Sequence, residues 1–388
     1  MRHITVLSGS AALIFALCAS MGITGSTDEV DPAIRQVNVF TSGTDGYHTF
    51  RIPALVTAKD GTVLAFCEGR KNAGSDTGDI DIVLKRSFDG GRIWQPMQVI
   101  WDDGDNVCGN PCPVVDGETG AIWLLLTHNL GRDSEPGIID GTSEGTRTVW
   151  VMKSDDAGAT WSEPREITAS TKKKNWTWYA TGPGVGIRHS GGRLVIPCDH
   201  IVAETKVFGS HVIWSDDHGA TWRLGGSVEP YSNECQVVEL SDKRLLLNMR
   251  NYSGNNRRAV SYSADRGATW TGRTFDDTLV EPVCQASILR YTCAECHAKS
   301  RILFSNPADT KRVNMTVRMS YDECGSWAVS KTLYPGPSAY SCLGRLKDGS
   351  ICCLYERGEE HAYEVITFAA FNLAWLTDGS DAVTAKRE

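Results

Sequence analysis

Several features that would indicate a membrane, nucleic-acid or metal-dependent protein are missing from this sequence. After the N-terminal segment, no stretch approaches the 18 consecutive apolar residues that suggest a membrane-spanning helix. The 39 basic and 47 acidic side chains give a formal net charge of −8, which argues against a nucleic-acid partner. No HExxH motif, zinc-spaced histidine cluster or EF-hand loop occurs, so we expect chemistry that needs no metal and no cofactor.

The N-terminus differs from the rest of the chain. Arg2 and His3 precede an apolar run from Ile4 to Ala19 that ends in small residues, a pattern typical of a secretory signal peptide. We therefore predict a signal peptide over residues 1–26 and one domain over residues 27–388. After cleavage the protein would be secreted, periplasmic or at the cell surface. Cleavage as a lipoprotein at Cys18 is less favoured, because the bulky Leu17 precedes it.

Removal of the signal peptide leaves twelve of the thirteen cysteines, an even number compatible with an oxidising compartment. Their pairing cannot be read from spacing, although Cys108 with Cys112 and Cys293 with Cys296 lie closest. The string CAECH, which ends at His297, formally matches a haem attachment motif. It lies between two strand-like runs where a hairpin should turn, so we interpret it as a loop with a disulfide or free thiols.

An eight-residue pattern, S-x-D-x-G-x-T-W, recurs along the chain. Three copies are nearly one string (SDDAGATW, SDDHGATW, SADRGATW), and SFDGGRIW and SYDECGSW have diverged. The central aspartates lie 67, 61, 48 and 57 residues apart and are Asp89, Asp156, Asp217, Asp265 and Asp322. Asp and Ser side chains bond nearby backbone amides, Gly permits positive φ and Trp packs on a sheet. Each copy therefore predicts a hairpin turn.

The runs around these copies alternate and are rich in β-branched residues, and no long helical period appears. Repeating units of this length, each a small antiparallel sheet, indicate a β-propeller. Five copies predict an all-β, six-bladed β-propeller in which one blade lacks the pattern. We interpret the copies as turns that stabilise blades, in preference to calcium loops or sugar sites.

One charged residue interrupts an apolar stretch near the start of the chain. In HTFRIPALV, Arg51 lies between Phe50 and the strand-like run that begins at Ile52. An arginine cannot lose its charge in a protein, so it needs an anion beside it. That anion is either a structural carboxylate or a ligand.

The FRIP string together with the repeated turns resembles the exo-sialidases of bacteria and animals, from about Arg35 to Trp375. The resemblance implies an enzyme that removes terminal α-linked sialic acids from oligosaccharides, glycoproteins or glycolipids. It also implies that hydrolysis proceeds with retention, through a tyrosyl-enzyme intermediate.

The resemblance further implies that Arg51, Arg250 and Arg312 bind the carboxylate of sialic acid. Guanidinium groups bind carboxylates in a bidentate geometry, and three converging cations make sense only for an anion. Arg318 lies close to Arg312 and is the alternative third arginine. Glu356 matches the glutamate that orients the FRIP arginine. Arg51 would therefore be paired with a structural carboxylate and would also bind the carboxylate of the ligand.

The resemblance makes Asp76, on a glycine-rich loop, the acid that protonates the leaving oxygen and later activates water. Asp79 and Asp81 are rivals, but their GDIDIV context runs directly into a strand. Arg70 matches an auxiliary arginine at the rim of the site.

The nucleophile implied by the resemblance is Tyr340, with Glu234 as its partner base. A neutral phenol avoids the repulsion that a carboxylate would meet at a carbon already bearing a carboxylate. Tyr355 has the wrong sequence context. Cys342 replaces an aspartate that the family usually carries, which puts one supporting contact in doubt.

Asn110, Trp178 and Tyr179 lie in segments that match those lining the acyl and glycerol pockets of the family, although both aromatic residues also suit a propeller core. Three alternatives remain: a trans-sialidase, an intramolecular trans-sialidase, and a non-catalytic sialic-acid-binding propeller. Linkage preference, acyl-form preference and oligomeric state stay open.

Overall fold

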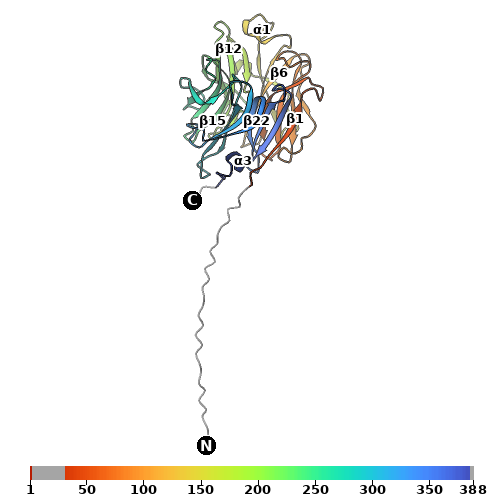
Figure 1. Ribbon diagram of the computed structural model, residues 1–388. Coiled ribbons are helices and arrows are strands. Elements are labelled where there is room, and N and C mark those ends of the chain that lie inside the picture. The colour runs from red at the N-terminus through yellow and green to blue at the C-terminus, as the bar shows by residue number, and fades with distance from the viewer. Residues whose placement is uncertain (2–30, 385–388) are drawn as a thin grey trace. The chain divides into compact units, whose positions relative to one another are not determined.

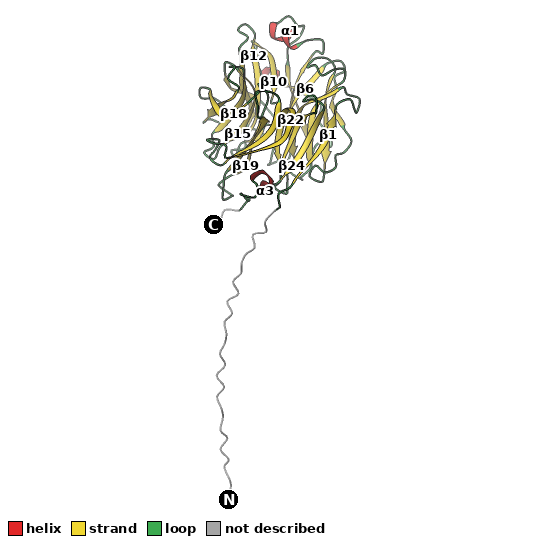
Figure 2. Ribbon diagram, viewed as in Figure 1, coloured by secondary structure: helices red, strands yellow, loops and turns green. Residues whose placement is uncertain are grey.

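The computed structural model describes Met1 and residues 31–384, and the unit from residue 31 onward is nearly all β-structure (Figures 1 and 2). It contains twenty-four strands and three short helices: α1 (Glu135–Asp140), α2 (Thr168–Thr171) and α3 (Leu373–Thr377). The predicted signal peptide falls outside the described residues, apart from Met1. In the described part of the chain, no helix is long and apolar enough to cross a membrane.

The strands form six four-stranded antiparallel blades, so the predicted fold class is confirmed. The first blade contains β2 (Thr49–Thr57), β3 (Val63–Arg70), β4 (Ile80–Ser87) and β5 (Gln98–Trp101). The second contains β6 (Val107–Val115), β7 (Ile122–Asn129), β8 (Thr148–Ser154) and β9 (Arg165–Glu166). The third contains β10 (Trp176–Thr181), β12 (Leu194–Val202), β13 (Phe208–Ser215) and β14 (Arg223–Val228), with the short β11 (Ile187–Arg188) beside β12.

The fourth blade contains β15 (Ser232–Glu239), β16 (Leu245–Asn251), β17 (Arg257–Ser263) and β18 (Thr274–Val280). The fifth contains β19 (Ser287–Thr292), β20 (Arg301–Pro307), β21 (Val313–Ser320) and the first part of β22 (Val329–Arg345). The rest of β22 begins the sixth blade, which continues with β23 (Ile351–Arg357), β24 (Val365–Phe371) and β1 (Ile34–Thr41).

The ring of blades is closed by strands from both ends of the described chain. β1 pairs antiparallel with β24, from Ile34 opposite Phe371 to Thr41 opposite Val365. Around the ring, the first strand of a blade contacts a strand of the next blade, as in β2 with β6 and β22 with β2. The first and last blades therefore meet at a seam between segments that are far apart in sequence.

The repeated S-x-D-x-G-x-T-W pattern forms the turn between the third and fourth strands of a blade. In the second blade, Gly158 N donates to Ser154 Oγ at 2.8 Å and Thr160 N donates to Asp156 Oδ1 at 2.9 Å. The same bonds recur in the other copies. The sixth blade lacks the turn because its outer strand, β1, comes from the other end of the chain and is not continuous with β24.

The core lies between neighbouring blades, which explains why a strand such as β3 is buried along its whole length. Apart from Cys296, the described cysteines are free thiols, and nine of them are buried in this packing. The CAECH segment forms the predicted turn between β19 and β20, in which His297 N donates to Cys293 O at 3.0 Å.

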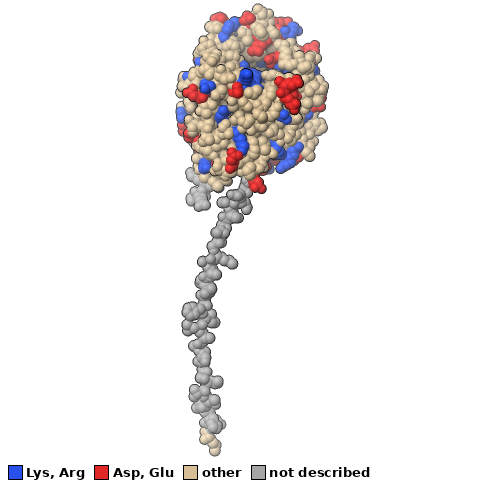
Figure 3. Space-filling model, viewed as in Figure 1, with Lys and Arg blue, Asp and Glu red and all other residues tan. Residues whose placement is uncertain are grey.

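On the face shown in Figure 3, basic and acidic side chains of the described residues are interspersed.

Candidate active site

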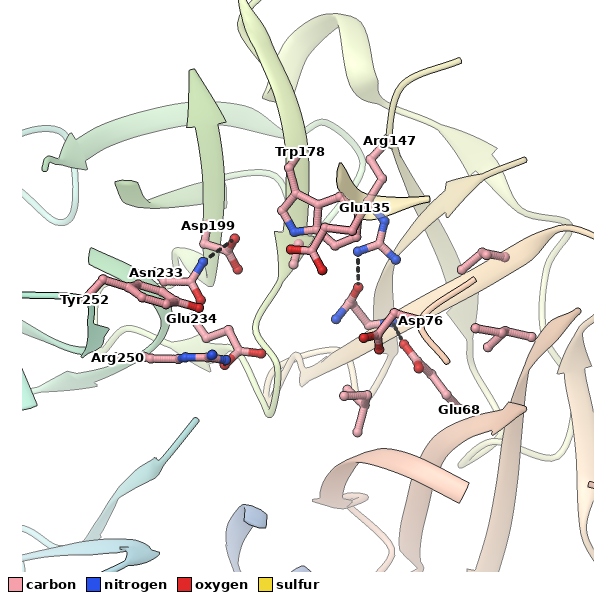
Figure 4. Close-up of a pocket in the computed structure, with 15 residues that line it drawn as sticks. Glu68, Asp76, Glu135, Arg147, Trp178, Asp199, Asn233, Glu234, Arg250 and Tyr252 are labelled. Atoms are coloured by element: carbon pink, nitrogen blue, oxygen red, sulfur yellow. Dashed lines mark hydrogen bonds and ion pairs between the residues drawn. The ribbon is translucent and has the colours of Figure 1, made fainter. Parts of the chain in front are cut away.

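A cavity opens at the end of the propeller where α1 lies, opposite the end that carries α3 (Figures 1 and 4). Its lining comes from the first four blades and from α1. The predicted site residues that line it are Asp76, Asn110, Trp178, Glu234 and Arg250. Three further predicted residues contact this lining directly: Tyr340 through Glu234 and Arg250, Arg70 through Asp76, and Glu356 through Ile52.

Arg51 is buried and held by Glu356 across the seam between the first and last blades. Arg51 Nε donates to Glu356 Oε1 at 2.8 Å, and the same oxygen accepts from Ile52 N at 2.9 Å. The other carboxylate oxygen accepts from Tyr340 N at 3.0 Å. Ile52 has φ of 63°, an unusual conformation for a β-branched residue, and the β2–β3 register shifts beside it. The predicted carboxylate partner of Arg51 is present.

Tyr340 lies at the centre of the polar groups. Its hydroxyl donates a hydrogen bond to Glu234, whose other oxygen accepts from Arg250 Nη1 at 2.6 Å. Arg250 Nη1 also lies 3.2 Å from Tyr340 Oη. Burial, and next the charge of Glu234, raise the pKa of Tyr340 well above its ordinary value. The free protein thus holds a neutral phenol with a carboxylate ready to accept its proton.

Arg312, not Arg318, completes the group of arginines. Arg51 Cζ and Arg312 Cζ lie 5.1 and 5.7 Å from the centroid of the Tyr340 ring. Arg318 instead donates to Asn306 Oδ1 at 3.2 Å. Arg51, Arg250 and Arg312 therefore surround one phenol, which makes this end of the site cationic.

Asp76 is half-exposed on the loop between β3 and β4, and Arg70 Nη2 donates to its Oδ1 at 2.5 Å. Arg70 is buried and is itself held by Glu68 at 2.7 Å. Removal from water favours the neutral acid, but the charges of Arg70 and Arg51 outweigh it and lower the pKa of Asp76. Asp76 is therefore ionised in the free protein at neutral pH.

The rival carboxylates have structural partners. Lys71 Nζ lies 3.1 Å from both Asp79 Oδ1 and Asp81 Oδ2, and Tyr47 Oη donates to Asp81 Oδ2 at 2.6 Å. Asp81 is fully buried. These two aspartates anchor the base of the loop that carries Asp76, and neither lines the cavity.

Asn110 connects the two sides of the site through its backbone and side chain. Its N–H donates to Glu68 Oε1 at 2.8 Å, and its Oδ1 accepts from Arg147 Nη1 at 2.9 Å. Arg147 in turn lies over the Trp178 ring, with Cζ 4.0 Å from the centroid. Asn110 and Trp178 therefore belong to one packed wall, and Arg147 is a member that sequence reasoning missed.

The cavity also has an acidic wall, formed by Asp199 on β12 and Glu135 on α1 (Figure 4). Asp199 is buried; its Oδ1 accepts from Asn233 at 3.1 Å, while its Oδ2 has no hydrogen-bond partner among the described residues. Burial and the charge of Glu234 raise the pKa of Asp199. Removal from water raises the pKa of Glu135, although Arg147 opposes it.

The placement of Tyr179 differs from the prediction. It is fully buried among core residues, and its hydroxyl donates to Thr171 O at 3.4 Å, so it does not line the cavity. Neighbouring residues of a strand point to opposite faces, and Trp178 takes the cavity side. Tyr355 is also a core residue, bonded to Gln36 at 2.6 Å.

Cys342 keeps a contact with the FRIP strand in place of the usual aspartate. Its buried sulfur accepts from Leu55 N at 3.2 Å. The replacement of the usual aspartate by Cys342 therefore affects a contact that supports β2, and not a contact of Tyr340 itself.

Comparisons with known proteins agree with this geometry. A model of the BNR repeat-like domain matches residues 61–353. The sialidase of Micromonospora viridifaciens is 36% identical over 89% of this chain and 55% of its own length. The exo-alpha-sialidase of Arthroderma benhamiae is 32% identical over 86% of both chains. The chain belongs to the sialidase family.

A solved structure gives the same result. The Hadza microbial sialidase Hz136 superposes with a TM-score of 0.81 and 33% identity, over 88% of this chain and 69% of that one. This sialidase-family chain spans 55% of the length of the Micromonospora relative. Among its described residues, no group of three or more His, Cys, Asp or Glu side chains is placed to hold a metal ion.

The contact between Glu356 and Arg51 predicts a large effect on stability. Glu356→Ala would leave the buried guanidinium of this sialidase-family chain without its counter-charge and two backbone N–H groups without their acceptor. We expect the free energy of unfolding to fall by about 3–5 kcal/mol in urea denaturation. Glu144→Ala, which removes an exposed partner of Arg132, is the control and should unfold like the unmodified protein. Equal stability of the two variants would contradict this account.

Proposed function

We propose that the protein is an exo-α-sialidase that hydrolyses terminal α-linked sialic acids from oligosaccharides, glycoproteins or glycolipids, with retention of configuration. One observation carries the proposal: three guanidinium groups surround a buried tyrosine that is bonded to a carboxylate. Three converging cations favour an anionic ligand, and the tyrosine–glutamate pair can supply a nucleophile and its base.

The polarity of the cavity suits sialic acid. The arginines offer bidentate donors to the carboxylate on its anomeric carbon. The lining of the cavity also offers the unpaired Oδ2 of Asp199 and the carboxyl group of Glu135. A ligand hydroxyl satisfies such a group in either protonation state, because a hydroxyl both donates and accepts. A sugar with a carboxylate at one end and hydroxyls at the other matches this division.

In the proposed first step, Tyr340 attacks the anomeric carbon and the glycosidic C–O bond breaks. The phenol proton passes to Glu234, and Asp76 gives a proton to the leaving oxygen. Asp76 must first be protonated, although its pKa is low in the free protein. A bound carboxylate would offset the charge of Arg51, one of the two leading causes of that low pKa, and so favour the acid form.

In the proposed second step, Asp76 takes a proton from water, and the resulting nucleophile attacks the same carbon. The bond from carbon to Tyr340 breaks, and Glu234 returns its proton to the phenol oxygen. Each step inverts the configuration, so the product keeps that of the substrate.

The function is tested by incubating the protein with sialyllactose and following the products by NMR. We expect lactose and free sialic acid that appears first as the α-anomer. Early β-anomer would contradict the two-step mechanism. A new sialoside or an anhydro sugar would instead indicate transfer or intramolecular transfer, and binding without any product would indicate a non-catalytic propeller.

Tyr340→Phe removes one oxygen and keeps the ring beside the arginines. We expect kcat to fall by several orders of magnitude while affinity for sialic acid changes little. A 3-fluorosialyl fluoride should label the unmodified protein on the peptide SAYSCLGR, as peptide mass spectrometry would detect. Tyr355→Phe, which removes a hydroxyl from the core, is the control and should retain turnover. Labelling of Glu234 or Asp76 would refute the role of Tyr340.

Arg70→Gln tests the electrostatic control of Asp76. The substitution removes the cation that contributes most to the low pKa of Asp76, so that pKa should rise. The general acid works when protonated, and a higher pKa keeps it protonated at higher pH. The alkaline limb of the kcat/KM profile, which reports the free enzyme, should therefore move to higher pH. Arg244→Gln, at an exposed ion pair, should leave the limb in place. A limb that is unchanged or shifted downward in Arg70→Gln would contradict the proposal.

A further inference from the structure

Tyr363 contacts two of the three arginines, although no sequence pattern singled it out. It lies in the loop between β23 and β24. Arg51 Cζ is 4.1 Å from the centroid of its ring, and its hydroxyl oxygen accepts from Arg312 Nη1 at 2.6 Å. A cation over the face of a tyrosine ring is attracted to it, so the ring and the hydroxyl each hold one guanidinium. Tyr363 thus joins arginines from the first and fifth blades.

The loop is built so that Tyr363 has a defined position. The carboxylate of Glu364 accepts from the backbone N–H groups of residues 359, 360 and 361 at 3.1, 2.8 and 3.0 Å. The carbonyl oxygen of Tyr363 accepts from Ser42 Oγ at 2.8 Å, and its N–H donates to His361 Nδ1 at 3.2 Å. The backbone is therefore bonded on both sides of the residue.

The hydroxyl of Tyr363 has an unused donor. A phenol carries one proton and can also accept hydrogen bonds. The bond with Arg312 uses the oxygen as an acceptor, and among the described residues the phenol proton has no acceptor. Its donor therefore lies next to Arg312 and Arg51, the groups to which a ligand carboxylate would bind. A carboxylate there would accept from the phenol as well as from the guanidinium groups.

We propose that Tyr363 is a fourth carboxylate-binding residue, which aligns Arg51 with Arg312 and donates its own proton to the substrate carboxylate. This inference rests on the proposed function and adds to it a neutral donor between two cations. The alternative is that Tyr363 only holds its loop in place.

Tyr363→Phe separates these two roles, because it removes the hydroxyl and keeps the ring against Arg51. Tyr334→Phe is the matched control: the Tyr334 hydroxyl donates to Gly358 O at 2.7 Å, at the start of the same loop. For Tyr363→Phe we expect KM for a fluorogenic sialoside to rise roughly ten- to hundredfold, the range for one hydrogen bond to a charged group. The value of kcat should change little, because the carboxylate is bound in both the ground and the transition state. Tyr334→Phe should change neither constant.

The didehydro analogue of sialic acid gives a second readout. Calorimetry should show that Tyr363→Phe weakens binding of the free acid by a similar factor and leaves binding of its methyl ester almost unchanged. Equal weakening of acid and ester, equal effects of Tyr363→Phe and Tyr334→Phe, or a loss confined to kcat would each overturn the inference. Failure of the unmodified protein to cleave sialosides and to bind the acid would instead refute the proposed function.

Discussion

The buried carboxylate of Glu356 supports both the closure of the propeller and the geometry of the site. It belongs to β23 of the last blade, and it binds Arg51 and Ile52 of the first blade and the backbone of Tyr340. A left-handed backbone at a β-branched residue costs about 1–3 kcal/mol and persists only where its surroundings enforce it. At Ile52 that enforcement includes the bond from its N–H to Glu356. The backbone conformation next to Arg51 therefore depends on a residue that is adjacent only once the ring has closed.

The three arginines are not equivalent in charge. Arg51 is paired with Glu356 and Arg250 with Glu234, at 2.8 and 2.6 Å. Arg312 contacts the phenol of Tyr363, and no carboxylate of the described residues lies within ion-pair distance of it. Its positive charge is thus uncompensated by a direct partner. A ligand with a single carboxylate would balance this charge while sharing the other two guanidinium groups.

The sequence predicted those features that a repeated or locally unusual pattern encodes. The repeated turns gave five of the six blades, because each turn is bonded within its own eight residues. Arg51 stood out as a charge in an apolar run. The same signal is present at Asp199, within LVIPCDHIV, and it could have identified the acidic wall.

Other parts of the site depend on contacts between blades that no local pattern records. Tyr363 lies in a loop and Glu135 at the start of the short helix α1, segments whose sequence gives no periodicity, and the closed ring brings them to the site. The error at Tyr179 has a different origin. Two adjacent aromatic residues on one strand cannot both face the cavity, and without the register either one suited it.

The two groups proposed to act on the substrate place opposite demands on the charge of the site. Tyr340 is buried beside Glu234, and both effects raise the pKa of its phenol. Asp76 is half-exposed, and the cations beside it lower its pKa. A substrate carboxylate adds a negative charge near both, which makes Asp76 a readier proton donor but makes ionisation of Tyr340 still less favourable. In the proposed reaction the phenol therefore cannot lose its proton before the attack, and transfer to Glu234 must accompany formation of the new bond. The hydrogen bond from Tyr340 to Glu234 is the arrangement that such a coupled transfer requires.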